Sequence, residues 1–456
     1  MLSSCYLSGS IDSSLRNLQS LSIIRLNGNK FFAPVPDFFA YFKNLTSLEI
    51  SSSWLNGKFP EKIFQVPTLR TLDLSHNFLL EGYLPEFPPN GSLQTMKLQD
   101  TLFSGTLPPS IGNLKMLSTI MLERYNFTGP IPDTIASLKQ LVHLDMSYNG
   151  FSGSIPNSMA SLTRLVYLDM SYNSFNGLIT NSMMNLTRLV YLSMFVNNFS
   201  GSIPIFSMTK NLDILDLSQN SQNGQIPISL FSLPSLRSVQ LSKNQFSGFN
   251  NQFSDQMKEF CNISSHLLEY LSLGSNNLEG PIPIFILELQ GPILNLSLKN
   301  LNLPSNQLQG QLPMISSVQY LDFSSNRFHS SIPASIGQSL ASTISFSLSS
   351  NKFYGTIPRS ICNVANLEVL DLSNNSFSGT IPECLILMSG QTHLQVPDLR
   401  TNNLNGTIPD AFPNNCSLQF LALNENRLGG ELPKNLANCT MLGLLDIGNN
   451  RIEVYH

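Results

Sequence analysis

Charged residues are scarce in this sequence. Asp, Glu, Lys and Arg together make up 12% of its 456 residues, whereas globular proteins usually contain about 25%. The net charge is -4, and no run of Lys and Arg stands out. Proteins that bind nucleic acid need a basic patch to neutralise phosphates, so the composition argues against that class.

Long apolar runs are missing as well. No stretch approaches the ~18 consecutive apolar residues of a transmembrane helix. Residues 1–10 lack the basic and apolar regions of a signal peptide. Both ends of the chain read as parts of repeats rather than as the polar caps of a solenoid. The sequence itself therefore predicts no secretion signal and no membrane anchor within these residues.

The cysteines form no C-x-x-C pair, which argues against zinc and thioredoxin-like sites. Cys439 follows Asn438 just as Leu114 follows Asn113 in an earlier repeat. This equivalence favours buried thiols that pack as small hydrophobic residues. Disulfides in the C-terminal third remain an open alternative. The six cysteines are Cys5, Cys261, Cys362, Cys384, Cys416 and Cys439.

Motifs of catalysis are absent too. The sequence has no P-loop, kinase catalytic loop, H-E-x-x-H or G-x-S-x-G, and its histidines show no ligand spacing. We expect no enzyme, no cofactor and no metal site. Several aspartates recur, but their spacing equals the repeat, which predicts a structural column on the outward face of a sheet. They are Asp73, Asp145, Asp169, Asp216, Asp322, Asp371 and Asp446.

The dominant feature is a repeat of mostly 24 residues. One block reads L-x-L-x-x-N, as in Leu72–Asn77, and a second reads L/F-x-G-x-I/L-P, as in Phe103–Pro108. Eighteen positions align with the asparagine of the first block. They are Asn29, Ser53, Asn77, Thr101, Tyr125, Asn149, Asn173, Asn197, Asn220, Asn244, Asn276, Asn306, Asn326, Asn351, Asn375, Asn402, Asn426 and Asn450.

The chemistry of one repeat predicts one coil of a solenoid. The L-x-L alternation gives a short strand with inward leucines, and the asparagine amide can satisfy backbone groups of adjacent coils. The glycine and Ile-Pro then fix a tight, extended exit before a short helical or 3₁₀ turn. We predict an α/β solenoid with a parallel sheet on its concave face. Regular coils span 1–248, an irregular region 249–305, and further coils 306–456.

The L-x-G-x-I-P unit resembles the plant-specific leucine-rich repeat, which occurs in receptor kinases, receptor-like proteins and polygalacturonase-inhibiting proteins. Several stretches resemble more narrowly the Verticillium wilt resistance type of receptor-like protein. These stretches are Ile63–Pro67, Leu230–Leu236, Ser305–Pro313, Ser360–Asn363 and Leu436–Cys439.

The resemblance implies the ectodomain of an immune receptor on the outer face of the plasma membrane. Such a receptor binds pathogen-derived protein, peptide or glycan ligands and signals through a co-receptor kinase. Its membrane helix would lie in segments that this sequence does not contain. Two alternatives remain open: a secreted inhibitor of cell-wall-degrading enzymes, and a non-functional truncated receptor remnant.

Outward positions of successive strands predict an aromatic patch on the concave face, although tyrosines also stack simply to cover a sheet. The predicted ligand-binding residues are Arg124, His143, Tyr148, Tyr167, Tyr172, Tyr191 and Phe195. N-x-S/T sequons predict glycosylation if the chain is secreted. Their acceptors are Asn44, Asn90, Asn126, Asn185, Asn198, Asn262, Asn295, Asn374, Asn405, Asn415 and Asn438.

Overall fold

The computed structural model describes residues 2–124, 126–250, 267–283, 286, 298–391 and 394–453. It divides into two compact units, unit 1 (Met1–Leu236) and unit 2 (Arg237–His456). Each unit is a row of coils in which a three-residue strand is followed by extended chain and a short turn. The α/β solenoid prediction is confirmed.

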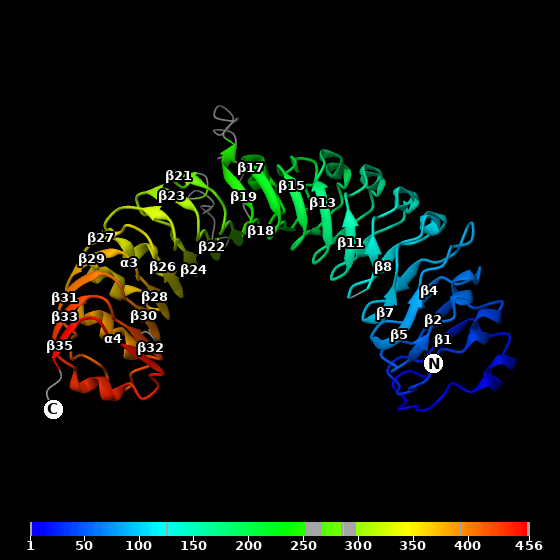
Figure 1. Cartoon of the computed structure of the whole chain (residues 1–456), viewed down its shortest axis with the longest axis horizontal. Helices are drawn as coiled ribbons and strands as arrows, with labels where there is room; N and C mark the ends of the chain where they lie inside the picture. Colours follow the sequence, from blue (N-terminus) through cyan, green and yellow to red (C-terminus); the bar gives the residue numbers. More distant parts are fainter. Residues whose placement is uncertain are drawn as a thin grey trace. The chain divides into compact units, whose positions relative to one another are not determined.

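The main sheet of unit 1 is parallel and strictly in register. Leu144 pairs with Leu168, and Leu168 with Leu192, so each strand repeats its neighbour one coil further on. Within this unit the strands line the inner side of the curve (Figure 1). They are β1 (Ile23–Arg25), β2 (Ser47–Glu49), β4 (Thr71–Asp73), β6 (Thr95–Lys97), β8 (Thr119–Met121), β10 (His143–Asp145), β12 (Tyr167–Asp169), β14 (Tyr191–Ser193) and β16 (Ile214–Asp216).

Short strands and 3₁₀ turns complete the coils of unit 1. The strands are β3 (Asn56–Lys58), β5 (Asn77–Tyr83), β7 (Thr101–Ser104), β9 (Thr128–Gly129), β11 (Gly150–Gly153), β13 (Ser174–Leu178), β15 (Asn198–Gly201) and β17 (Ser221–Pro227). The turns are η1 (Ser13–Asn17), η2 (Asp37–Tyr41), η3 (Glu61–Gln65), η4 (Pro109–Asn113), η5 (Asp133–Ser137), η6 (Asn157–Ser161), η7 (Asn181–Asn185) and η8 (Ile228–Ser232). Most turns start directly after a proline, which takes the extended N-cap position and cannot itself donate a backbone hydrogen bond.

Unit 2 repeats the plan. Its main strands are β18 (Ser238–Gln240), β20 (Tyr270–Ser272), β22 (Asn300–Asn302), β24 (Tyr320–Asp322), β26 (Ser345–Ser347), β28 (Val369–Asp371), β30 (Val396–Asp398), β32 (Phe420–Ala422) and β34 (Leu444–Asp446). Its other strands are β19 (Gln245–Asn250), β21 (Glu279–Gly280), β23 (Gln307–Gly310), β25 (Arg327–Phe328), β27 (Tyr354–Gly355), β29 (Ser376–Gly379), β31 (Asn403–Thr407), β33 (Arg427–Glu431) and β35 (Arg451–Glu453). Its helical segments are α3 (Ile336–Ser339), η9 (Arg359–Asn363), α4 (Glu383–Gln391) and η10 (Lys434–Asn438).

The repeated asparagines form a hydrogen-bonded ladder inside both units. In one rung Asn197 Nδ2 donates to Met170 O of the preceding coil at 2.9 Å and to Met194 O of its own coil at 3.2 Å. Its Oδ1 accepts the Phe175 N–H at 3.0 Å. Each amide thus closes its own turn and joins it to the previous one, as the sequence predicts. Where serine replaces asparagine, Ser53 Oγ still donates to Leu26 O at 2.9 Å.

A second internal column consists of phenylalanines. Phe127, Phe151, Phe175 and Phe199 stack with near-parallel rings whose centroids lie 6.0–6.2 Å apart. All four are almost fully buried. These side chains occupy the second position after the ladder residue, so the core of each coil is filled partly by its neighbours. Stacking therefore supplies the burial that one coil lacks.

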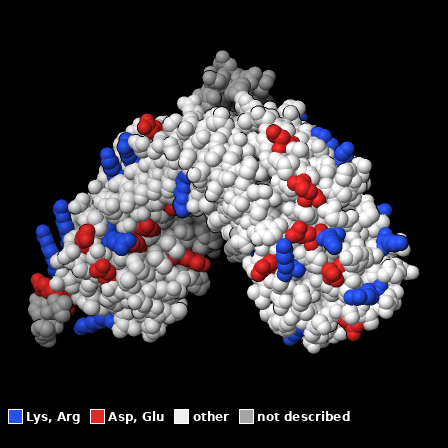
Figure 2. All heavy atoms as spheres, turned by 45° about the vertical axis from the view of Figure 1, so that its right-hand side comes forward, with Lys and Arg blue, Asp and Glu red and all other residues white. Residues whose placement is uncertain are grey.

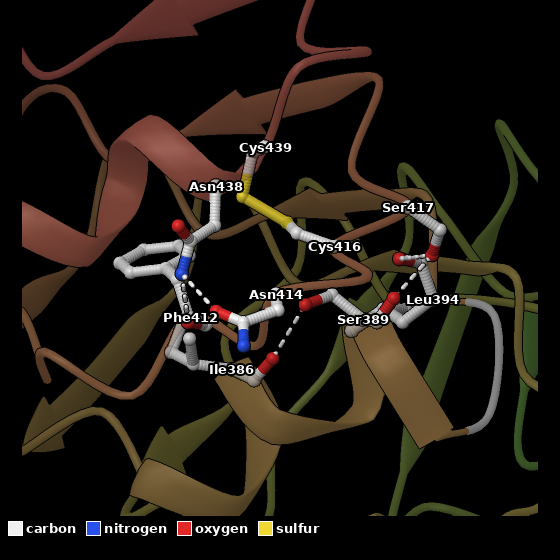
Figure 3. Close-up of a disulfide and its surroundings, with 9 residues drawn as sticks. All are labelled: Ile386, Ser389, Leu394, Phe412, Asn414, Cys416, Ser417, Asn438 and Cys439. Carbon is white, nitrogen blue, oxygen red and sulfur yellow. Dashed lines mark hydrogen bonds between the residues drawn. A yellow bond between two sulfur atoms is a disulfide. The ribbon is translucent and has the colours of Figure 1, made fainter.

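Four of the six cysteines are disulfide-bonded, so the prediction of buried thiols is wrong for them and the alternative of disulfides in the C-terminal third is confirmed. Cys362 pairs with Cys384, and Cys416 pairs with Cys439. Figure 3 shows the second bond joining the end of η10 to the coil before it. The cysteines of each pair are separated by 22 and 23 residues, which is close to one repeat. This separation places the partners on adjacent coils, which the comparison of single repeat positions did not take into account. Cys5 is an exposed thiol, and Cys261 lies outside the described residues.

The predicted irregular region 249–305 is described only in part. Its described residues include β20 and β22, which pair in register with each other, with Leu271 opposite Leu301. Asn276 also keeps its place in the ladder, because its Nδ2 donates to Leu241 O at 3.0 Å. The domain boundaries of the sequence analysis stay a prediction.

Candidate functional site

Two aromatic columns lie on the strand face of unit 1. In the inner column His143 stacks on Tyr167 at 4.2 Å and Tyr167 on Tyr191 at 4.4 Å, with rings parallel within about 5°. These residues start β10, β12 and β14, and the parallel register places them directly opposite one another. Repetition of one strand position thus builds a continuous stack.

The outer column comes from the residue before the ladder asparagine at Tyr148 and Tyr172, and from one residue earlier at Phe195. Tyr148 stacks on Tyr172 at 4.0 Å, and Tyr172 meets Phe195 edge-on at 5.0 Å. The backbone at Tyr148 and Tyr172 has φ of 54° and 50°, the left-handed region that side chains other than glycine rarely occupy. The hydrogen bonds that join each turn to the next coil hold this geometry, as in Tyr148 N–H to Ser171 O at 2.9 Å.

Arg124, which sequence analysis placed in the same patch, is held by an acidic partner. Its Nη1 lies 3.2 Å from Asp100 Oδ1, while His76 Nδ1 lies 2.7 Å from Asp100 Oδ2. The three residues occupy the same position in consecutive coils. Arg124 therefore belongs to an ion-paired row that borders the aromatic columns.

The repeated aspartates have a structural role, as their spacing predicts. Asp169 Oδ1 accepts the Ser171 N–H at 2.9 Å, and Asp145 Oδ1 accepts from Ser147 N and Oγ. The second oxygen of Asp169 faces the aromatic column, where Oδ2 lies 3.4 Å from the hydroxyls of both Tyr167 and Tyr191. These aspartates brace the strand ends and also make the face acidic.

Within the described residues this acidic row has no ion-pair partner, and Arg124 acts on Glu123 only through its longer-range charge. Among the described residues, Glu123, Asp145, Asp169 and Asp216 take part in no ion pair. Within the same part of the chain, Gln99 Oε1 and His143 Nε2 are buried without a hydrogen-bond partner. Gln99 follows β6, and His143 is the first residue of β10. The face therefore carries negative charge beside an aromatic stack, and two polar atoms buried behind it have no hydrogen-bond partner.

The local environment shifts the pKa of several side chains on this face. Burial, contact with Asp145 and the charge of Asp100 raise the pKa of Glu123 to about 7. Burial also raises the pKa of the Asp169 and Asp216 carboxyls and lowers the pKa of His143. In the same way, burial raises the pKa of Tyr191 to about 12. The face thus gains negative charge as the pH rises through neutrality.

Replacing Glu123 by glutamine is expected to flatten the pH dependence of stability. The folded-state pKa of Glu123 lies above the ordinary value of 4.5, so the folded state binds more protons and wild-type stability falls between about pH 4.5 and 7. The full pKa shift of Glu123 corresponds to a loss of roughly 3 kcal/mol in the free energy of unfolding at high pH. Solvent screening of this partly exposed side chain leaves about 1–2 kcal/mol at pH 8. The measurement is the thermal unfolding midpoint of both proteins at pH 5 and pH 8.

Glu123→Gln should raise the midpoint at pH 8 and change it little at pH 5. The matched control is Glu81→Gln, an exposed glutamate of β5 in the same unit. A pH-independent difference for Glu123→Gln would contradict the expected protonation.

An exposed apolar cluster near the N-terminal end was missed by the sequence analysis. This N-terminal ridge consists of Phe32, Trp54, Phe78 and Leu79, each more than half exposed, with Phe32 and Trp54 rings 5.2 Å apart. Beside it lies a cup of about 260 Å³ lined by Ser52, Trp54, Leu55, His76, Phe78 and Leu79. A signal was available, because the residue after the ladder position is apolar at Trp54, Phe78 and Leu102 but polar or glycine in the later coils of unit 1.

The predicted glycan acceptors differ in accessibility. Asn126 and Asn438 are half-buried, and Asn262 and Asn295 lie outside the described residues. The exposed acceptors are Asn44, Asn90, Asn185, Asn198, Asn374, Asn405 and Asn415.

Charged side chains are scattered thinly over the surface in view (Figure 2). Among the residues that the structure describes, no helix is long and apolar enough to cross a membrane. Across the same ranges, no group of three or more His, Cys, Asp or Glu side chains is arranged to hold a metal ion.

Comparisons with known proteins identify the repeat. The family model "Leucine Rich Repeat" matches residues 68–90, 140–162, 164–186, 317–339, 366–388 and 417–439. The chain is 37% identical over 99 residues to Receptor-like protein 6 of Arabidopsis thaliana, a segment that covers 22% of this chain and 10% of that protein. The aligned part is therefore a small fraction of the relative's length.

Solved structures extend the likeness to nearly the whole chain. The plant peptide hormone receptor RGFR1, in complex with RGF2, matches with a TM-score of 0.79 at 29% identity and covers 98% of this chain and 78% of its own. The Arabidopsis receptor kinase HAESA, in complex with the peptide hormone IDA and the co-receptor SERK1, matches with a TM-score of 0.64 at 27% identity and covers 98% and 77%. The chain thus has the leucine-rich-repeat solenoid fold of plant receptor ectodomains, and the sequence matches support a place for it among plant leucine-rich-repeat receptor-like proteins.

Proposed function

We propose that this chain is the extracellular ligand-binding part of a plant cell-surface receptor-like protein. It binds a protein or peptide ligand on the strand face of unit 1. The observation that carries the proposal is the stacked His143–Tyr167–Tyr191 column beside carboxylates that form no ion pair within the described residues. Aromatic side chains with polar tips are favoured anchors in interfaces.

The same geometry favours a ligand that carries arginine or lysine. Asp145, Asp169 and Glu123 create a negative potential, and a cationic side chain gains from carboxylates in a partly desolvated site. The ring faces of the inner column cover one another, so few open faces are left for stacking a sugar. A positively charged peptide segment therefore fits this face better than a glycan.

Relatives support the wider role. RGFR1 and HAESA were solved with peptide hormones, and HAESA also with a co-receptor. By analogy, we propose that ligand binding here recruits a partner kinase at the plasma membrane. Recognition of pathogen-derived molecules, as in the Verticillium wilt resistance type, belongs to the same proposal.

The test compares two probes that differ only in charge. Hexa-arginine amide and hexa-citrulline amide are titrated into the purified chain at low salt, because citrulline keeps the shape of arginine and removes its charge. We expect the arginine peptide to bind about tenfold tighter or more, a difference of ~1.4 kcal/mol. Asp145→Asn combined with Asp169→Asn should abolish this preference, and so should Tyr167→Ala combined with Tyr191→Ala.

The matched control is Asp371→Asn combined with Asp398→Asn. These aspartates accept similar backbone hydrogen bonds in unit 2, from Ser373 and Arg400, but Val369 and Val396 replace the aromatic residues there. The control pair should keep wild-type binding. Equal binding of the two peptides, or a loss in the Asp371/Asp398 control as large as in the Asp145/Asp169 variant, would refute the role of the strand face. Thermal melting of each variant separates lost binding from lost folding.

A further inference from the structure

Each half of one disulfide occupies the centre of a glycosylation sequon. Cys416 lies in Asn415-Cys416-Ser417, and Cys439 lies in Asn438-Cys439-Thr440. Both sulfurs are paired with each other, and both cysteines are almost fully buried. The same short segments can therefore receive a glycan or take part in a coil-to-coil crosslink.

Both amide hydrogens of Asn438 are used in the folded coil. Its Nδ2 donates to Phe412 O at 3.0 Å and to Asn414 Oδ1 at 3.3 Å, and the side chain points between these groups (Figure 3). Unit 1 contains the same contact at an asparagine outside any sequon, since Asn113 Nδ2 donates to Phe87 O at 2.9 Å. The hydrogen bond thus belongs to the architecture of the coil and needs no glycan to explain the asparagine.

Asn415 is arranged differently. Its side chain is exposed, and its Nδ2 makes one hydrogen bond, to Gly390 O at 2.9 Å. One of its two amide hydrogens is therefore sufficient for the fold. A substituent on Nδ2 can replace the other hydrogen and extend into solvent.

We propose that Asn415 carries an N-linked glycan, that Asn438 stays unmodified in the folded chain, and that a glycan on Asn438 and the Cys416–Cys439 disulfide exclude each other. This inference rests on the extracellular placement proposed above. It assigns opposite fates to two sequons that both have cysteine at the central position.

The chemistry of the two reactions explains the exclusion. Glycan transfer from a lipid-linked oligosaccharide diphosphate forms a bond between sugar C1 and asparagine Nδ2. It breaks the C1–O bond to the diphosphate and releases one Nδ2 proton. Asn438 would then keep one N–H and lose one of its two hydrogen bonds. Disulfide formation transfers two electrons and two protons from the thiols to an oxidised dithiol protein, and it fixes Cys439 against the preceding coil.

A bulky sugar on Asn438 would stand beside the point where the two coils must meet. The Cα atoms of Cys416 and Cys439 are only 4.7 Å apart, and η10 ends at Asn438. Early crosslinking thus removes the flexible tripeptide that the transferase needs, while early glycosylation obstructs the crosslink.

The test is site-specific glycopeptide mass spectrometry on the whole chain, secreted from plant cells behind a cleavable signal. Asn405, which is exposed, serves as the internal reference. We expect high occupancy at Asn405 and Asn415, and about tenfold lower occupancy at Asn438. Cys416→Ser combined with Cys439→Ser keeps both sequons and should raise Asn438 occupancy about tenfold. Cys362→Ser combined with Cys384→Ser should leave it unchanged.

Two results would overturn the inference: high occupancy of Asn438 on chains whose Cys416–Cys439 bond is intact in non-reducing peptide maps, or an unmodified Asn415. If the variant without Cys416 and Cys439 is not secreted, single asparagine variants test which sequon carries a glycan. Asn415→Gln should lower the intact mass by one glycan. Asn438→Gln should remove no glycan from the intact mass, but it should lower the melting temperature. Binding of hexa-arginine amide by the same protein tests the proposed function separately.

Discussion

Phe175→Ala is expected to lower the free energy of unfolding of unit 1 by about 3–5 kcal/mol, the range for deleting a fully buried phenylalanine. Phe175 is fully buried between Phe151 and Phe199, with centroids 6.0 and 6.2 Å away. Its removal opens a cavity that both neighbouring coils line. Chemical denaturation followed by circular dichroism measures the loss.

Hydrogen exchange would show where the damage lies. Stability in repeat proteins is carried by nearest-neighbour interfaces, so a cavity in one coil should increase exchange first in the coils around β11, β13 and β15. Leu178→Ala is the matched control, since Leu178 belongs to β13 but is 58% exposed. Equal destabilisation by both variants would show that the phenylalanine column is not a main source of stability.

The second large effect is expected for Asn197→Ala, which should destabilise unit 1 by about 2–4 kcal/mol. The substitution removes the acceptor of the Phe175 N–H and the donor to Met170 O and Met194 O. Leaving buried polar groups without partners costs more than the net value of the bonds themselves. The denaturation midpoint reports the change.

The neighbouring residue provides an internal comparison. Asn198 follows in the chain but is exposed and stands outside the ladder, so Asn198→Ala should change stability by less than about 0.5 kcal/mol. Protein made in bacteria avoids any effect of the Asn198 sequon. If the two alanine substitutions lower the free energy of unfolding by the same amount, the ladder hydrogen bonds contribute nothing to stability beyond side-chain propensity.

The fold could be predicted almost completely because every coil carries the same sequence pattern. Leu144, Leu168 and Leu192 recur at one interval, and only stacking of coils buries all of them. The ladder was predictable too, since Asn197 and its equivalents stand where each strand ends. Prediction was weakest where the repeat itself is irregular, because the interval then no longer fixes which residues are neighbours.

The aromatic stack could also be predicted, because the repeat places His143, Tyr167 and Tyr191 at the same outward position of successive strands. The sequence could not show that Asp100 holds Arg124, or that Glu123 faces Asp145. Those contacts depend on side-chain directions across coils. The cysteine pairing had a usable signal, since Cys416 and Cys439 are separated by nearly one repeat.

The N-terminal ridge has a consequence for spectroscopy. Trp54 is the only tryptophan of the chain, and its half-exposed ring lies against Phe32 in the first coils of unit 1. Intrinsic tryptophan emission therefore reports on those coils alone, whereas circular dichroism averages over every strand. Coincident denaturation curves from the two signals would mean that the coils unfold as one cooperative body. An earlier emission change would mean that the chain opens from its N-terminal coils, which would leave the stack of β10, β12 and β14 folded after the ridge is lost.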